Sequence, residues 1–187
     1  MPEQIKLLKY SINASVEAFS TMRFSSLPYP VIQAKQCHGT GIAVINSYDT
    51  KAEDLENIDA LITQQKGIAI GVRTADCVPI LLYDPVSKAI AAIHAGWRGT
   101  VAKIAKVTIE KMAELYGSKA SDMTAVIGPS ISMESFQVGE ELADAFRDAG
   151  FPMDKILKDM GTIVEKTNLP VGTKVNAIES PMRGGLH

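Results

Sequence analysis

Apolar and polar positions along the chain predict a mixture of strands and helices. Short apolar runs, several rich in β-branched residues as is typical of strands, recur through the first two thirds of the chain. They cover residues 5–10, 16–21, Val31 to Ala34, Ile42 to Ile45, Gly67 to Val72, Val78 to Tyr83, Ala89 to His94 and Ala125 to Ile127. Asp84-Pro85 separates two of these runs and is a turn signal, so Val78 to Tyr83 and Ala89 to His94 are predicted to form a hairpin.

Two segments have the apolar spacing of a helix. From Thr100 to Tyr116, apolar residues recur every three or four positions, and Gly117 is a natural stop. Glu140 to Ala149 predicts a second helix, which ends at Gly150. Strands and helices that do not alternate regularly favour an α+β fold, a layered α/β/α sandwich with a mixed sheet and flanking helices.

The length of 187 residues suits a single domain over residues 1–187, within which 161–187 is a poorly defined C-terminal segment rich in Gly, Pro, Thr and Asn. A net charge of −2 predicts no electrostatic attraction to nucleic acid or to an acidic membrane. The sequence shows neither a signal peptide nor an apolar run near the roughly 20 residues of a membrane span. We therefore expect a cytoplasmic protein.

Three potential metal ligands stand at the ends of apolar runs. The chain has only three histidines and two cysteines, and His38, Cys77 and His94 each lie beside Gly, Asp or Pro. Cys77 begins one strand of the predicted hairpin and His94 ends the other, so the two could meet. One thiolate and two imidazoles leave one position of a tetrahedral zinc ion open, which is typical of a catalytic site.

Each of these residues also has a structural interpretation. A single cysteine in an apolar setting is often a small core residue, and a histidine at a strand end is often a hydrogen-bonded polar residue. Cys37 is a rival ligand. Because adjacent residues in an extended segment point to opposite faces, we expect Cys37 to pack in the interior if His38 faces the site.

The segment from Gly96 to Thr100 leads directly into the predicted helix. Backbone N–H groups at a helix start, two glycines and Arg98 could together bind an anion close to His94. The alternative is that the glycines only shape a turn between strand and helix.

Two charged residues near Cys77 each have a functional and a structural interpretation. Asp76 could orient a ligand or act as a general base, or it could be a turn residue. Arg73 could bind a substrate anion or pair with a carboxylate.

Several blocks of the sequence together resemble one known family. The blocks are Gln36-Cys37-His38-Gly39, Thr74-Ala75-Asp76-Cys77-Val78-Pro79, His94-Ala95-Gly96-Trp97-Arg98-Gly99 and Ile127-Gly128-Pro129-Ser130. They resemble the multicopper polyphenol oxidase, or laccase-domain, family. Its members are described as zinc-dependent purine nucleoside phosphorylases with adenosine deaminase activity, and one bacterial branch is called peptidoglycan editing factor.

The resemblance implies a zinc enzyme with a purine nucleoside and phosphate as substrates. His38, Cys77 and His94 would hold the zinc. Catalytic roles would fall to Asp76 and Arg98, and the substrate would be bound by Arg73, Arg23, Gly96 and Thr100. The implied fold is the layered sandwich particular to the family.

Copper is the less favoured metal, because three histidines in the whole chain cannot furnish the ligands of a multicopper centre.

Three alternatives to the nucleoside enzyme stay open. One is a hydrolase that edits peptidoglycan precursors. Another is a zinc-binding remnant without activity, because segments typical of the family are missing. The last is a zinc-stabilised binding module, which would need Cys37 or His187 as a fourth ligand.

Overall fold

The computed structural model describes residues 7–21, 27–162 and 174–178, and the chain divides into two compact units, Met1–Ser130 and Ile131–His187. The single domain expected from the sequence stays a prediction. Among the described residues, no helix combines the length and apolar character that crossing a membrane requires.

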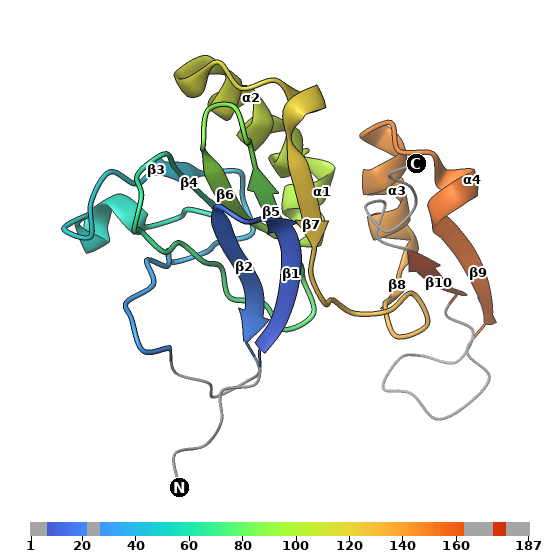
Figure 1. Ribbon diagram of the computed structural model, residues 1–187. Helices are drawn as coiled ribbons and strands as arrows, with labels where there is room; N and C mark the ends of the chain where they lie inside the picture. Colours follow the sequence, from blue (N-terminus) through green and yellow to red (C-terminus); the bar gives the residue numbers. More distant parts are fainter. Residues whose placement is uncertain (1–6, 22–26, 163–173, 179–187) are drawn as a thin grey trace, which may run out of the picture. The chain divides into compact units, whose positions relative to one another are not determined.

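The first unit is built on a five-stranded mixed sheet in the order β3-β4-β6-β5-β7 (Figure 1). Its strands are β3 (Ile42–Val44), β4 (Ala60–Thr63), β5 (Val78–Tyr83), β6 (Ile90–Ala95) and β7 (Thr124–Ile127). The β3–β4 pair is parallel and the other pairs are antiparallel. This confirms the predicted α+β class with a mixed sheet.

The predicted hairpin is confirmed as β5 and β6. Asp84 turns the chain between them, because its carboxylate accepts hydrogen bonds from the Val86 N–H and the Ser87 hydroxyl. β6 is the central strand, and every residue from Ala91 to Ala95 is buried. The hairpin is therefore held on both sides, which makes its strand ends a rigid base for functional side chains.

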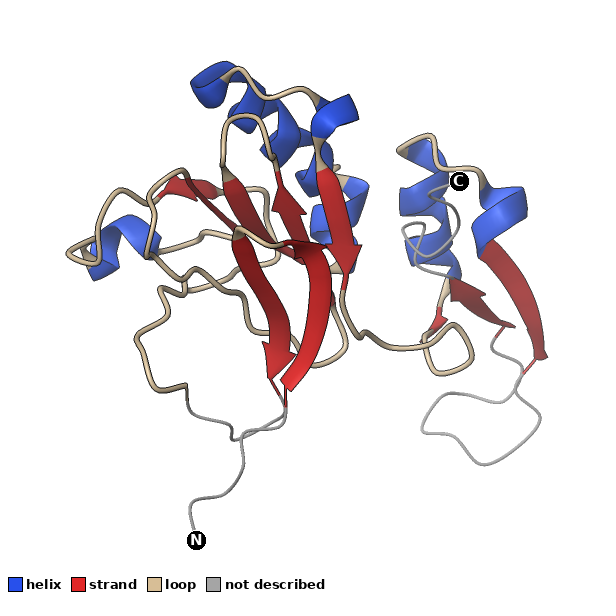
Figure 2. Cartoon of the chain, viewed as in Figure 1, coloured by secondary structure: helices blue, strands red, loops and turns tan. Residues whose placement is uncertain are grey.

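A second hairpin, β1 (Leu7–Asn13) with β2 (Val16–Thr21), forms a separate two-stranded sheet (Figure 2). β1 lies beside β7 at the edge of the large sheet. The hydroxyls of Tyr10 and Ser20 are 2.8 Å apart and lie against Gly128, which follows β7. The two early strands predicted from the sequence are thus confirmed.

Two expectations about strands were wrong. Gly67 to Val72 forms no strand; only Ile70 makes an isolated bridge, to Ile32. Ile68 and Ile70 instead pack against the buried cluster of Ile32, Ala34, Ile45, Leu55 and Leu61, so their apolar character reflects core packing. Val31 to Ala34 likewise forms no strand and has only the bridge at Ile32, and β4 had no predicted counterpart.

The helix predicted from Thr100 to Tyr116 is in fact two helices, α1 (Trp97–Val101) and α2 (Ile104–Tyr116). Lys103 separates them in the left-handed conformation, with φ of 60°. This residue turns the chain, so that α1 packs on β6 while α2 covers both β6 and β4. Regular apolar spacing does not reveal such a break, because it continues across it.

The described residues of the second unit form two helices and a three-stranded antiparallel sheet in the order β8-β10-β9. Its elements are β8 (Gln137–Val138), α3 (Glu140–Asp148), α4 (Met153–Ile156), β9 (Leu157–Thr162) and β10 (Lys174–Ile178). α3 confirms the second predicted helix, and Gly150 follows it with φ of 77°. Within 161–187, which the sequence leaves poorly defined, the structure describes the end of β9 and β10, and the rest lies outside the described residues.

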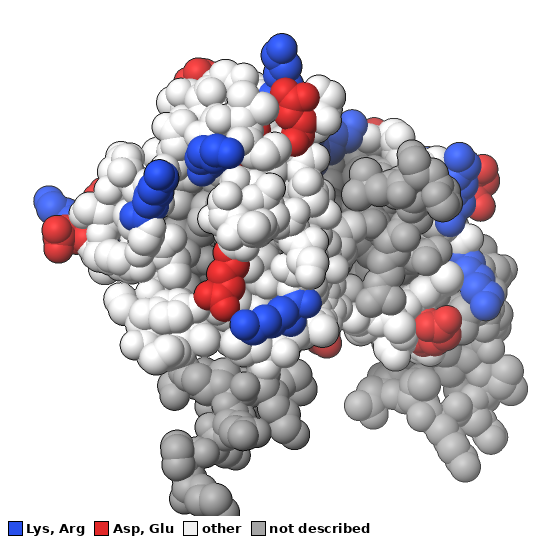
Figure 3. Space-filling model, in the orientation of Figure 1, with Lys and Arg blue, Asp and Glu red and all other residues white. Residues whose placement is uncertain are grey.

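On the face shown in Figure 3, basic and acidic side chains are interspersed over the first unit. Ion pairs within the first unit include Lys35 with Glu56 and Lys106 with Glu110. No extended basic surface appears on this face, in keeping with the small net charge.

Candidate metal centre

The fold brings the three predicted metal ligands together. One potential ligand atom each from His38, Cys77 and His94 lie within 4.8 Å of one another. The two imidazole rings meet edge to face, with centroids 4.9 Å apart. His94 is buried, Cys77 is half-buried and His38 is exposed, so the group has a protected side and a side open to solvent. Such a cluster is a possible site for one metal ion.

The β5–β6 hairpin accounts for two of the three ligands. In its register Val78 lies opposite Ala95 and Pro79 opposite His94. Cys77 therefore stands one residue before the ladder, next to Gly96, which stands one residue after it. A Cβ built on Gly96 would be 3.2 Å from Cys77 Sγ and 2.8 Å from His38 Cδ2. The predicted meeting of Cys77 and His94 is a consequence of this register.

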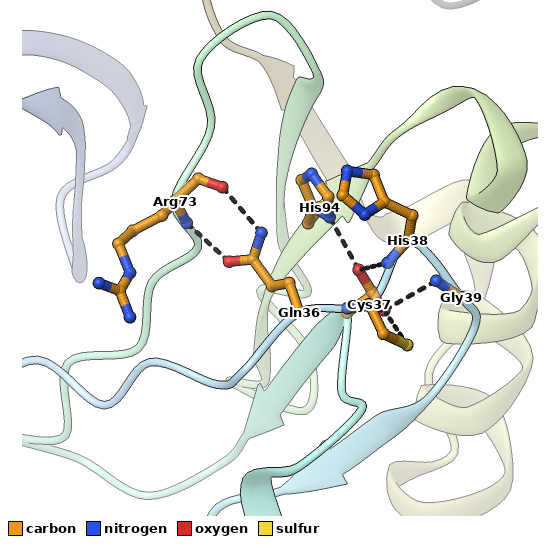
Figure 4. Close-up of polar contacts among 7 residues, drawn as sticks. Gln36, Cys37, His38, Gly39, Arg73 and His94 are labelled. Carbon is orange, nitrogen blue, oxygen red and sulfur yellow. Dashed lines mark hydrogen bonds and ion pairs between the residues drawn. The ribbon is translucent and has the colours of Figure 1, made fainter.

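The third candidate ligand, His38, lies in a tight loop between Cys37 and Gly39 (Figure 4). This loop folds around the side chain of Asp59. The backbone N–H groups of Cys37, His38 and Gly39 donate to the Asp59 carboxylate over 3.1, 2.9 and 2.9 Å. His38 is left-handed, with φ of 65°. Successive N–H groups converging on one anion in this way form a nest.

Asp59 is also hydrogen-bonded to the imidazole of His94. Its Oδ1 lies 2.8 Å from Nδ1 of His94, and both side chains are buried, Asp59 with 0 % of its surface exposed. Burial alone would raise the pKa of Asp59, but the hydrogen bonds from His94 and from the backbone of Gly39 and Cys37 outweigh it and leave the pKa below its usual value. Asp59 is therefore a carboxylate in the folded protein.

Sequence reasoning missed Asp59 and favoured Asp76 as the residue that orients a ligand. A signal was present, because Asp59 directly precedes the wholly buried strand β4. A carboxylate at the start of a buried strand needs donors around it. Asp76 is exposed, and its negative charge adds to burial in raising the pKa of the Cys77 thiol. A metal ion would have to displace the proton of that thiol.

Two hydrogen bonds hold the Cys77 loop beside the His38 loop. The Gln36 side chain accepts from the Arg73 N–H and donates to the Arg73 carbonyl, both over 2.8 Å (Figure 4). The same two segments are bonded further back, where Ile32 pairs with Ile70. They therefore run side by side and in the same direction towards His38 and Cys77. The Arg73 guanidinium points away from both imidazoles in Figure 4.

The residues predicted to bind an anion lie on α1. Gly96 precedes this helix, and a Cβ built on it would meet two of the candidate metal ligands. Thr100 is buried, and its N–H donates to the Gly96 carbonyl within the helix over 2.8 Å. Arg98 is exposed, with its guanidinium carbon 4.3 Å from the centre of the Trp97 ring. The roles of these residues in substrate binding stay predictions.

Cys37 does not pack in the interior as expected. It is exposed, and its thiol lies 3.3 Å from Asp59 Oδ2. The expectation assumed an extended chain, whereas the left-handed His38 breaks the alternation of side chains. Cys37 is not in the group formed by the three ligands. Arg23 and His187, also named from the sequence, lie outside the described residues.

Comparison with known proteins shows related sequences and a related fold. Residues 13–175 match the family described as multi-copper polyphenol oxidoreductase laccase. The chain is 45% identical over 138 residues to a purine nucleoside phosphorylase of Bacteroides thetaiotaomicron, an alignment that covers 71% of this chain and 51% of the relative. It is 41% identical over 133 residues to adenosine deaminase RL5 from an unknown prokaryotic organism, covering 68% of this chain and 50% of the relative.

The chain thus spans about half the length of these two relatives. A crystal structure of the Neisseria meningitidis protein NMB0706 superposes with a TM-score of 0.73, at 23% identity, over 97% of this chain and 80% of that one. At this identity the likeness shows the fold.

Proposed function

The chain belongs to the multi-copper polyphenol oxidoreductase laccase family, and on this premise we propose that it acts as a zinc-dependent purine nucleoside phosphorylase with adenosine deaminase activity. The observation that carries the proposal is the convergence of His38, Cys77 and His94 within 4.8 Å. The names of the two relatives, a purine nucleoside phosphorylase and an adenosine deaminase, support the choice of reaction.

The donor set fits zinc. Donors bound to one tetrahedral zinc ion at about 2.0–2.3 Å lie roughly 3.3–3.8 Å from one another. A spread of up to 4.8 Å would therefore close to this range with a small movement of the side chains. Copper also binds a thiolate and imidazoles. However, the three histidines of the chain are too few for the several copper ions that the family description names.

A bound zinc ion would supply Lewis acidity and an activated water for substitution at C6 of adenosine. The chain's own groups would bind and orient the substrates. Arg98 offers an exposed cation one turn or less from Gly96, suited to phosphate. Asp76, which is exposed and precedes Cys77 in the chain, would accept or deliver a proton.

The test is to replace Cys77 with alanine and measure both bound zinc and product formation from adenosine and phosphate. We expect loss of zinc together with loss of inosine and free base. Full zinc content in this variant would reject the ligand assignment. Turnover of a peptidoglycan precursor but not of adenosine by the wild type would instead favour the editing hydrolase, and zinc binding without any turnover would favour the inactive remnant.

Cys37→Ala is the matched control, because it also removes one thiol from the same region. A site of three protein ligands keeps its zinc in this variant. A structural module with Cys37 as fourth ligand loses it. The comparison of the two cysteine variants therefore separates an open metal site from one that Cys37 closes.

A further inference from the structure

One buried carboxylate connects two of the three residues in the metal centre. Oδ1 of Asp59 accepts from both the His94 ring and the His38 backbone N–H, at 2.8 and 2.9 Å. Oδ2 accepts from the N–H groups of Cys37 and Gly39. The Cys37 thiol adds a further contact, with its sulfur 3.3 Å from Oδ2. No described Lys or Arg side chain forms an ion pair with Asp59, so hydrogen bonds from His94 and from residues 37–39 balance its charge.

We infer that Asp59 is the positioning residue of the metal centre. It holds the proton of His94 on Nδ1, so that Nε2 presents its lone pair to the ion, and it folds the loop that brings His38 to the same point. The inference rests on the proposed metal-dependent function. It assigns to one side chain the placement of ligands that are 56 residues apart in the sequence, His38 and His94.

The protonation of His94 follows from the chemistry of its partner. An ionised carboxylate can only accept hydrogen bonds, so the imidazole nitrogen that faces it must be the donor. A neutral imidazole has one N–H, which leaves the other nitrogen free for a metal ion. Partners of this kind orient histidine ligands in many metal sites.

The shape of the His38 loop follows from the same carboxylate. A non-glycine residue at φ of 65° is unfavourable by itself and needs compensation from its surroundings. The three N–H groups of residues 37–39 can all point at one anion only when the chain turns in this way. Without the carboxylate, these donors would lose their common acceptor. The loop would then lose the hydrogen bonds that hold His38 beside His94.

The experiment compares Asp59→Asn with Asp84→Asn in the full chain, by competing for Zn²⁺ with a chelating dye. Asparagine has the size of aspartate but offers an NH₂ group in place of one oxygen. That NH₂ group faces either the His94 Nδ1–H or the N–H groups of the loop, and both are donors. We expect Asp59→Asn to bind Zn²⁺ about 10–100-fold more weakly than wild type.

Asp84 is the matched control because it is equally buried and accepts backbone and hydroxyl hydrogen bonds, yet it lies at the opposite end of the β5–β6 hairpin from Cys77 and His94. We expect Asp84→Asn to destabilise the fold and leave Zn²⁺ affinity within about twofold. Equal affinity of Asp59→Asn and wild type would overturn the inference, as would an equal loss in both variants.

A second measurement needs no variant and so does not depend on whether Asp59→Asn folds. Nitrogen-15 NMR of the wild-type protein with Zn²⁺ should show the His94 proton on Nδ1, and a proton on Nε2 would overturn the inference. Failure of the wild type to bind Zn²⁺ would instead reject the proposed metal-dependent function and this inference with it. The two failures are therefore distinguishable.

Discussion

Gly96 and Cys77 lie so close together that any side chain on the glycine would enter the metal centre. A Cβ at position 96 would be 3.2 Å from the Cys77 sulfur and 2.8 Å from His38 Cδ2. The backbone of Gly96 has φ of −70°, which any residue can adopt. The requirement for glycine here is therefore one of space beside the ligands, and it has a direct consequence for metal binding.

We expect Gly96→Ala to weaken Zn²⁺ binding about tenfold or more, because the added methyl group displaces His38 or Cys77. Chelator competition measures the effect. Gly128→Ala is the control, since its Cβ would also meet an atom at 2.8 Å, but that atom is Pro79 Cγ. Both variants should lose some stability, and only the first should lose metal. Equal metal affinity in the two would show that the space beside Gly96 is not needed.

The Gln36–Arg73 hydrogen bonds hold the two ligand-bearing loops together, and Gln36→Ala removes both. At an exposed position we expect a loss of about 1 kcal/mol in the free energy of unfolding, accompanied by a several-fold weaker Zn²⁺ affinity. Gln64→Ala is the control, because it removes a hydrogen bond to the Ser87 carbonyl in another loop. If Gln36→Ala lowered the free energy of unfolding but left the Zn²⁺ affinity unchanged, the two loops would be positioned independently of these hydrogen bonds.

Asp84 makes the stability of the first unit sensitive to acid. Burial raises its pKa, but hydrogen bonds from Ser118, Ser87 and Val86 outweigh burial, and the pKa lies below its usual value. Its contribution is thus complete above about pH 3.9, the usual value for aspartate, and is lost as the pH falls through the lower folded-state pKa.

We therefore expect Asp84→Asn to lower the free energy of unfolding by about 1–3 kcal/mol at pH 7, and by progressively less below about pH 4. Urea unfolding of both proteins between pH 7 and pH 2.5 tests this. A difference that stays constant with pH would mean that the charge of Asp84 contributes nothing.

Lys103 carries a conformational cost that glycine would remove. Its φ of 60° lies in the left-handed region, and no side-chain cap compensates it. We expect Lys103→Gly to raise the free energy of unfolding by up to about 1 kcal/mol. Lys106→Gly, three residues further along α2, should lower it by about 1 kcal/mol, because glycine is a poor helix former. Thermal unfolding of the two variants should shift in opposite directions.

The sequence predicts the local parts of this molecule well. Two short apolar runs around Asp84-Pro85 are sufficient to predict the β5–β6 hairpin, because its hydrogen bonds join residues close together in the chain. Its register then places Cys77 near His94. The stop of α2 at Gly117 follows from the preference of glycine for the left-handed conformation, which the observed φ of 67° shows.

Predictions failed where packing decides between alternatives with the same pattern. The run Gly67 to Val72 is apolar because Ile68 and Ile70 face the core, but within the described part of the chain it pairs with a neighbour only at the Ile70–Ile32 bridge. The break at Lys103 falls inside an uninterrupted apolar spacing. In both segments the sequence identifies buried positions but does not indicate the type or the ends of the secondary-structure element that contains them.

The sequence determines the three candidate ligands, the hairpin that joins two of them and the α+β class. It does so because these features depend on residue chemistry and on pairing between residues close together in the chain. The position of His38 and the role of Asp59 are decided only by the tertiary structure. Asp59 lies 21 residues from His38 and 35 from His94, and nothing in the intervening sequence requires them to meet. They meet because the Asp59 carboxylate is buried at the start of β4 and therefore needs hydrogen-bond donors. In the folded chain these donors are the backbone N–H groups of the His38 loop and the ring of His94.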